Sequence, residues 1–216
     1  MIITVGRQLG SGGRETGQRL ATALGVSCYD KELLEITAKE SGLNQGLFEQ
    51  ADELTGRGLP AGMLGTRFPL FGDSATLNRG GLSSLSCGLS SLSCGLSNEM
   101  LFQLQSDVIR KLAERQPCVF IGRCADYILR DRTDCLNIFI CADETDRLRR
   151  ISSCHNISPD KARTLMESID KKRAAYYNYY TNKTWGMASS YHFCLNSSVL
   201  GIEGIVEFVM SIRLFT

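Results

Sequence analysis

A glycine-rich turn, GSGG at residues 10–13, is the first part of the sequence whose residue types suggest chemistry. It follows a short β-branched run, residues 2–5, and precedes a segment with apolar residues at helical spacing. Glycines let several backbone N–H groups face one anion, and the N-terminus of the following helix adds partial positive charge. The turn therefore predicts a phosphate-binding loop, and a turn without a ligand is the structural alternative. The expected phosphate-binding residues are Gly10, Ser11, Gly12, Gly13, Arg14, Glu15 and Thr16.

Two nucleotide-binding patterns compete for this loop. In a Walker A alignment Arg14 takes the lysine position, and Glu15 takes the position of the hydroxyl residue. The dinucleotide pattern G-x-G-x-x-G fits Gly10 and Gly12 but has Glu15 at the position of its third glycine. In that pattern Asp30 would suit the acid that binds the ribose. A glutamate against a pyrophosphate is unfavourable, and Arg14 has no role in a dinucleotide site. The loop alone predicts phosphate binding and leaves the class of nucleotide open.

Further basic residues follow later strand and helix patterns. Arg123 comes directly after the apolar run 118–121, and ligands of open parallel sheets bind beyond the carboxyl ends of the strands. Arg123 is therefore a candidate for holding a second phosphate, with a surface capping role as the alternative. Phosphoryl transfer needs cations around the migrating group. The other charged candidates are Arg147, Arg149, Arg150, Asp170, Lys171, Lys172 and Arg173.

Structural alternatives exist for these later charges and for the aromatic residues beside them. A run of charges also fits a solvated helix face, and the spacing of Asp170 and Arg173 fits an intrahelical ion pair. The tyrosines within residues 176–180 and Trp185 would stack on a base or pack the end of a helix against the domain. Packing is the favoured interpretation.

The elements that must position these residues alternate between strand and helix. Residues 158–159, Ser-Pro, form a helix start, because serine caps helices and proline suits the first helical position. The alternation predicts an α/β fold, a three-layer α/β/α domain with a five-stranded parallel sheet. The expected strands are residues 2–5, 26–29, 118–121, 136–141 and 191–195.

Bulk properties limit the classes of function. A chain of 216 residues with a hydrophobic fraction of 43% suits a single domain, residues 1–216. A net charge of +1 gives no general attraction to nucleic acid or membranes. The nine cysteines are odd in number and include no C-x-x-C pair, so reduced thiols are expected rather than disulfides or a zinc site. With no apolar segment long enough to span a bilayer, a cytoplasmic protein is expected.

One region interrupts the α/β pattern. Residues 42–97 are rich in glycine and serine, and GLSSLSC occurs twice in tandem within residues 81–97. A poorly ordered insertion is favoured there over an ordered amphipathic helix, because serine and glycine lower helix propensity.

Several long segments together resemble one family. GSGGRETG, YDKELL, GRCADYILRD, DKKRAAYYNYYTNKTWG and CLNSSVLGIEG resemble the cytidylate kinase-like family of P-loop nucleoside monophosphate kinases. The resemblance covers nearly the whole chain except about residues 56–97. It implies transfer of a phosphoryl group from ATP, with Mg²⁺, to CMP or dCMP. It also implies that the insertion at residues 42–97 is the acceptor-binding region and that residues 143–186 form a lid-like helical region. A non-catalytic nucleotide-binding protein and a kinase of another small phosphorylated acceptor remain the alternatives, and an NAD-dependent oxidoreductase is disfavoured.

The resemblance also implies roles for individual residues. Cys124 stands where the family pattern has an aspartate, and Ile36 where it has an arginine. The donor phosphates would lie on residues 11–14, with Thr16 near Mg²⁺. The acceptor would be held by Asp30, Lys31, Arg123, Asp170 and Arg173. The catalytic residues would be Arg14, Arg123 and Arg173.

Overall fold

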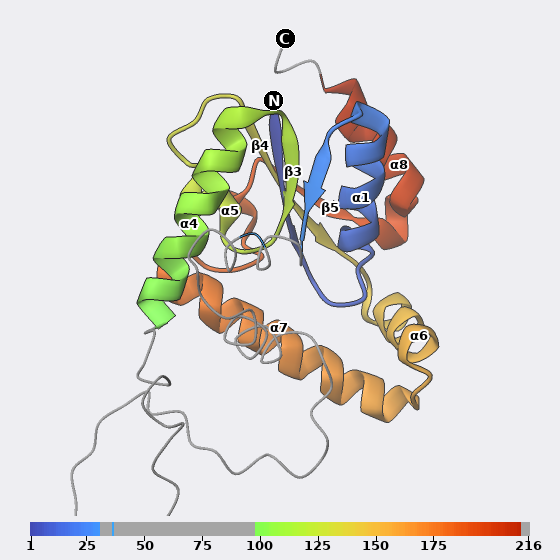
Figure 1. Cartoon of the computed structure of the whole chain (residues 1–216). Helices are drawn as coiled ribbons and strands as arrows, with labels where there is room; N and C mark the ends of the chain where they lie inside the picture. Colours follow the sequence, from blue (N-terminus) through green and yellow to red (C-terminus); the bar gives the residue numbers. More distant parts are fainter. Residues whose placement is uncertain (31–35, 37–97, 213–216) are drawn as a thin grey trace, which may run out of the picture.

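The computed structural model describes residues 1–30, 36 and 98–212 of the chain. Five strands form one sheet in the order β2-β3-β1-β4-β5, and all four pairings are parallel (Figure 1). The predicted five-stranded sheet is confirmed, with strand ends shifted by at most two residues. The strands are β1 (Ile2–Arg7), β2 (Ser27–Tyr29), β3 (Cys118–Ile121), β4 (Cys135–Cys141) and β5 (Phe193–Asn196).

Helices cover both faces of the sheet and its carboxyl edge. In Figure 1, α4 and α5 lie on one face, α1 and α8 lie on the other, and α6 and α7 lie beyond the carboxyl ends of the strands. This arrangement is the expected three-layer α/β/α fold. The helices are α1 (Gly13–Leu24), α4 (Asn98–Arg115), α5 (Ala125–Ile128), α6 (Glu144–His155), α7 (Pro159–Thr181) and α8 (Ser197–Ser211), with a 3-10 turn η1 (Ala188–Ser190).

Two apolar clusters hold the layers together, one on each face of the sheet. Ile2 packs with Ile109 of α4, whereas the next residue, Ile3, packs with Leu20 of α1 and Ile205 of α8. Successive strand residues point to opposite faces, so a strand that is buried on both sides must be apolar at consecutive positions. The apolar run of β3 follows from this requirement, and β1 and β4 are each interrupted by one polar residue, Thr4 and Asn137, which hydrogen-bond to each other at 2.7 Å.

The helical pair α6–α7 accounts for most of the expected lid-like region. Ser158 caps α7 by accepting a hydrogen bond from Lys161 N, and Pro159 occupies the start of the helix, as predicted. At the other end, Asn182 adopts a left-handed conformation with φ of 53°. The two caps fix the length of α7, which runs beneath the sheet and brings its middle to the glycine-rich loop.

Some predictions from the sequence concern residues outside the described ranges, and others can be compared with the structure only within them. The insertion at residues 42–97 and the acceptor candidate Lys31 lie outside them. Within them, no helix combines the length and the hydropathy needed to cross a membrane. Among the cysteines in the same part of the chain, Cys118, Cys124 and Cys135 are buried thiols.

Candidate functional site

The loop between β1 and α1 depends on glycine at two positions. Gly10 and Gly12 have φ of 75° and 77°, in the left-handed region that side chains disfavour. Space is also limited, because a Cβ added at Gly10 would lie 2.8 Å from the carbonyl oxygen of Arg147. A Cβ added at Gly12 would lie 2.9 Å from Ile202 Cδ1. The loop is therefore held closely between α6 and α8, and both glycines are required for that fit.

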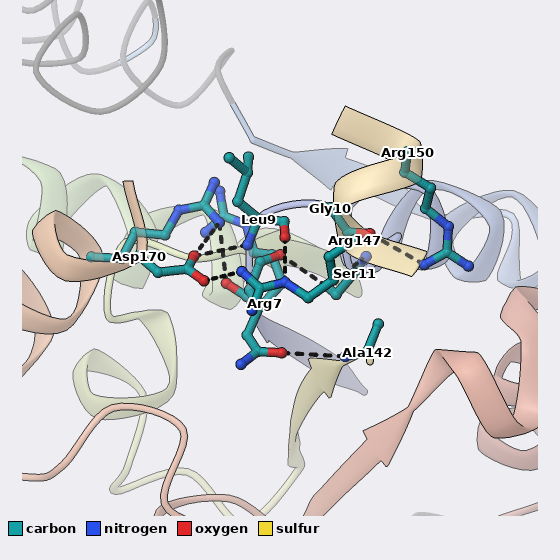
Figure 2. Close-up of polar contacts among 11 residues, drawn as sticks. Arg7, Leu9, Gly10, Ser11, Ala142, Arg147, Arg150 and Asp170 are labelled. Atoms are coloured by element: carbon teal, nitrogen blue, oxygen red, sulfur yellow. Dashed lines mark hydrogen bonds and ion pairs between the residues drawn. The ribbon is translucent and has the colours of Figure 1, made fainter. Parts of the chain in front are cut away.

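Three consecutive carbonyl groups of the loop accept hydrogen bonds from side chains of α6 and α8 (Figure 2). Donation at these positions orients the peptide units, since each carbonyl is drawn towards a helix that flanks the loop. Arg147 Nε donates to Leu9 O (2.7 Å), Arg150 Nη1 to Gly10 O (3.2 Å) and Ser197 Oγ to Ser11 O (2.6 Å).

In contrast to these carbonyl groups, several N–H groups of the same loop have no hydrogen-bond partner in the described ranges. Within residues 1–30, 36 and 98–212, no acceptor is found for four of them, which belong to Gly10, Gly12, Arg14 and Glu15. Two of the four lie in the first turn of α1, where a helix has no internal acceptors and carries partial positive charge. The loop thus combines occupied carbonyls with available N–H groups, which is the polarity that an anion requires.

Asp170 fastens the loop to α7. Its carboxylate accepts a hydrogen bond of 2.8 Å from Leu9 N and pairs with the Arg147 guanidinium, as Figure 2 shows. Arg147 is only 8% exposed, so this ion pair is largely shielded from water. Arg173, one turn further along α7, lies 3.8 Å from Asp170 and donates to Arg7 O. The intrahelical pair considered from the sequence is therefore present, and both residues also contact the loop.

Asp30, at the end of β2, binds two arginines. Arg14 Nε lies 2.8 Å from the Asp30 carboxylate, and Arg7 Nη2 lies 3.6 Å from it. Asp30 is 8% exposed, whereas the side chain of Arg14 is 51% exposed. The guanidinium of Arg14 is therefore directed towards the end of β2, on the side of the loop where the acceptor was expected.

A strained turn follows β3. Gly122, Arg123 and Cys124 have φ of 75°, 60° and 55°, so three consecutive residues are left-handed and two of them carry side chains. Gly122 N donates to Val5 O, which ties the turn to the end of β1. Non-glycine residues in this region are uncommon and cluster at functional sites. The turn places Arg123 at the carboxyl edge, next to the glycine-rich loop.

The charges around the loop form one cluster with a surplus of arginine. Burial is the main cause that lowers the pKa of Arg173, and the charges of Asp170, Asp30, Arg123 and Arg147 all act on it. Together with Arg7 and Arg14 on Asp30, these contacts set five arginines against two aspartates. A net positive edge beside free N–H groups suits two adjacent phosphate groups.

The remaining polar residues of the loop act within the protein. Ser11 Oγ donates to Gln8 O (2.9 Å) and accepts from Gly13 N (3.3 Å). Thr16 is fully buried, and its hydroxyl donates to Gly12 O (3.1 Å). Glu15 pairs with Arg19 at 2.6 Å on the outside of α1.

These contacts do not fit a protein-bound Mg²⁺. The Thr16 hydroxyl, expected near the metal, is turned into the helix, and Glu15 is turned away from the loop. Cys124 is buried in an apolar cluster with Phe139, and burial raises the pKa of its thiol. In the described ranges, no three potential metal ligands come together in one group. Magnesium would therefore reach the site as part of the MgATP substrate.

The aromatic segment packs against the domain, as favoured from the sequence. Tyr177 is buried and its hydroxyl donates to Asp126 (2.7 Å). Tyr180 stacks on Phe102 of α4 with a centroid separation of 4.1 Å. Trp185 meets the ring of Phe139 edge-on. These contacts anchor the C-terminal half of α7.

Three contributors to the site are not identified by the sequence patterns. Arg7 is not identified because it lies within β1. Ser197 is not identified because a serine that follows a strand has many possible roles. Gln8 takes the first glycine position of the Walker A alignment, which suggests no role for its side chain. In the structure its Oε1 accepts a hydrogen bond from Ala142 N and joins the loop to the end of β4. A basic residue between an apolar strand and a glycine-rich turn is the available signal for Arg7. Arg149 shares a charge run with Arg147 and Arg150, but it pairs with Asp146 on an exposed face.

A parallel sheet of this order, with a glycine-rich loop between its first strand and first helix, defines a P-loop kinase fold. Solved structures share it. An uncharacterized protein from Eubacterium ventriosum is 22% identical with a TM-score of 0.67, and the match covers 97% of this chain and 96% of the other. Shikimate kinase from Bacteroides thetaiotaomicron is 13% identical with a TM-score of 0.52, covering 98% and 97% of the two chains. Shikimate kinase from Acinetobacter baumannii is 12% identical with a TM-score of 0.50, covering 99% and 92%.

The family follows from the sequence itself. The profile of the cytidylate kinase-like family matches residues 2–199, and the chain belongs to that family. No curated protein matches the chain. The resemblance read from the motifs is confirmed.

Proposed function

We propose that this protein transfers the γ-phosphoryl group of MgATP to a nucleoside monophosphate, with CMP or dCMP as the expected acceptor. An oxygen of the acceptor phosphate bonds to the γ-phosphorus while the bond to the β–γ bridging oxygen breaks. The products are ADP and the nucleoside diphosphate. Membership in a kinase-like family supports phosphoryl transfer, and the named acceptor rests on the sequence motifs.

One observation carries the proposal: the loop holds its carbonyls against α6 and α8 and leaves four N–H groups without an internal acceptor in the described ranges. Such a loop stabilises the donor phosphates without rearranging. The peptide dipoles are already oriented before the ligand arrives, so little reorganisation energy is required. Positioning and neutralisation of charge supply most of the catalysis in phosphoryl transfer, and a dedicated general base is not needed.

The two substrates are assigned to different groups of the site. We assign the donor phosphates to the N–H groups of residues 10–15 and the acceptor phosphate to Arg123, which lies at the adjacent strand end. Asp170 is assigned a positioning role, because its carboxylate is used by Leu9 N and Arg147. Arg173 supports the same loop through Arg7 O and adds positive charge beside Arg123.

A different acceptor is the second candidate. Cys124 replaces the aspartate of the family pattern, and it is buried rather than turned towards the edge. An acceptor contact that the aspartate would provide is therefore missing. Shikimate kinases share the fold, and one of them is described in complex with shikimate, so the same architecture accommodates an acceptor without a base.

A coupled assay of ADP release from MgATP tests the proposal across the common nucleoside monophosphates and shikimate. We expect turnover with CMP or dCMP that is lost in Arg123→Ala. Arg115→Ala is the matched control, because Arg115 ends α4 at the amino edge of the sheet and should leave turnover unchanged. ATP binding without turnover on any acceptor would support a non-catalytic nucleotide-binding protein. Absence of ATP binding would refute the proposal.

A further inference from the structure

Arg7 occupies a space that two glycines keep open. A Cβ added at Gly13, the first residue of α1, would lie 2.5 Å from Arg7 Cβ. A Cβ added at Gly122, after β3, would overlap Arg7 Nη1. The two glycines come from separate segments, and each is in contact with a different part of the same side chain. Arg7 therefore runs from the start of α1 to the turn that carries Arg123.

Both ends of Arg7 are fixed by further contacts. Arg173 Nη1 donates to its carbonyl oxygen at 3.2 Å, and Asp30 lies 3.6 Å from its Nη2. Its side chain is 20% exposed, compared with 51% for Arg14, which shares the same carboxylate. One carboxylate therefore lies beside two guanidinium groups. Of the two, Arg7 is the more enclosed.

The position of the guanidinium group decides its role. Gly122 is bonded to β1 through Val5 O, and the strand order places the ends of β1 and β3 side by side. The side chain of Arg7 thus extends from the loop assigned to the donor phosphates to the turn assigned to the acceptor phosphate, and its guanidinium lies beside that turn. A phosphoryl group that passes between these two sites would meet it.

We propose that Arg7, rather than Arg14, supplies the positive charge that a lysine supplies in a Walker A loop. This inference rests on the proposed phosphoryl transfer and identifies a catalytic residue for it. In Walker A loops the lysine reaches the β- and γ-phosphates from the helix start. Here the volume beside the helix start is filled by a side chain from the preceding strand. A planar guanidinium forms two parallel hydrogen bonds to a phosphate, which a lysine cannot do.

The experiment compares Arg7→Gln with Arg14→Gln, because both substitutions remove one charge from the same carboxylate. Calorimetry with inorganic tripolyphosphate and with ATP measures donor binding without any acceptor. Losing a charge-assisted hydrogen bond should weaken binding by roughly 10- to 100-fold in Arg7→Gln. Arg14→Gln should have a smaller effect. Arg7→Lys keeps the charge without the fork and should fall between wild type and Arg7→Gln.

A double-mutant cycle separates this role from a merely structural one. Gly13→Ala should weaken tripolyphosphate binding by displacing Arg7, and it should have no further effect in an Arg7→Ala background. An equal loss in both backgrounds would overturn the inference, because the effect would then come from the loop backbone. Circular dichroism identifies any variant that fails to fold, and Arg7→Lys keeps the test decisive in that event.

The two proposals fail in different ways. Wild-type protein that binds tripolyphosphate and ATP but turns over no acceptor contradicts the proposed function, while Arg7 is still tested by affinity. Arg7→Gln protein that binds as tightly as wild type and turns over at the wild-type rate contradicts the role of Arg7 alone.

Discussion

The left-handed turn after β3 allows stability and activity to be separated at one residue. Arg123 has φ of 60°, where a residue with a Cβ is about 1–2 kcal/mol less stable than in the right-handed region. Glycine avoids this cost but loses about 0.5–1 kcal/mol more conformational entropy on folding. Arg123→Gly and Arg123→Ala both remove the guanidinium group and differ only in the Cβ. The glycine variant should therefore be the more stable of the two by about 0.5–1 kcal/mol.

Thermal and urea denaturation measure that difference. For a chain of this length it corresponds to a difference in Tm of about 1–4 °C. Arg123→Asn should lie between the two variants, because asparagine tolerates the left-handed region better than alanine. In the ADP-release assay all three variants should lose acceptor-dependent turnover, since none carries the guanidinium group. An alanine variant as stable as the glycine variant would show that the turn is not held in the left-handed conformation, and the link between strain and site would be refuted.

Two further predictions concern buried charges. Asp170→Asn leaves the Arg147 guanidinium without its charged partner. Urea denaturation should show a loss of about 3 kcal/mol in the free energy of unfolding, and ATP should bind more weakly. A loss below about 1 kcal/mol would contradict the positioning role of Asp170. Burial raises the pKa of Asp126 above its ordinary value, so the folded state binds a proton on this carboxyl group more tightly than the unfolded state does. As the pH falls from 7 towards 4, the free energy of unfolding of the wild type should therefore rise relative to that of Asp126→Asn. A stability difference between Asp126→Asn and wild type that does not change with pH would contradict this.

The three central strands of the sheet, β1, β3 and β4, were predictable because they are largely buried on both faces. Short runs of consecutive apolar residues, bounded by glycines and polar segments, are typical of strands in the middle of a parallel sheet. The strand ends were less predictable, since hydrogen bonding extends beyond the apolar run. Gly6 and Arg7 stay in register with Phe139 and Ile140 of β4, so β1 continues into residues that the apolar pattern assigned to the loop.

The position of the glycine-rich turn was predictable, whereas the partners of the arginines around it were not. Glycine spacing determines where the backbone turns, but a long side chain reaches several neighbours that only the tertiary fold brings close. Arg14 matched the Walker A lysine by spacing, and the fold turns it to Asp30. Arg150 reaches Gly10 O from 140 residues away along the chain. No local pattern contains that information.

The contacts of Arg147, Arg150 and Asp170 also constrain how residues 143–186 can act as a lid. All three side chains hydrogen-bond to the backbone of the loop, so movement of α6 and α7 away from the sheet must break these bonds (Figure 2). The loop carbonyls would then lose the donors that orient the peptide units, and the affinity of the N–H groups for phosphate would fall. By linkage, phosphate on the loop must favour the closed position of α6 to the same extent. If residues 143–186 act as a lid, donor binding and lid closure would form one coupled equilibrium, and substitutions in α6 should change the affinity for ATP even where they contact no phosphate.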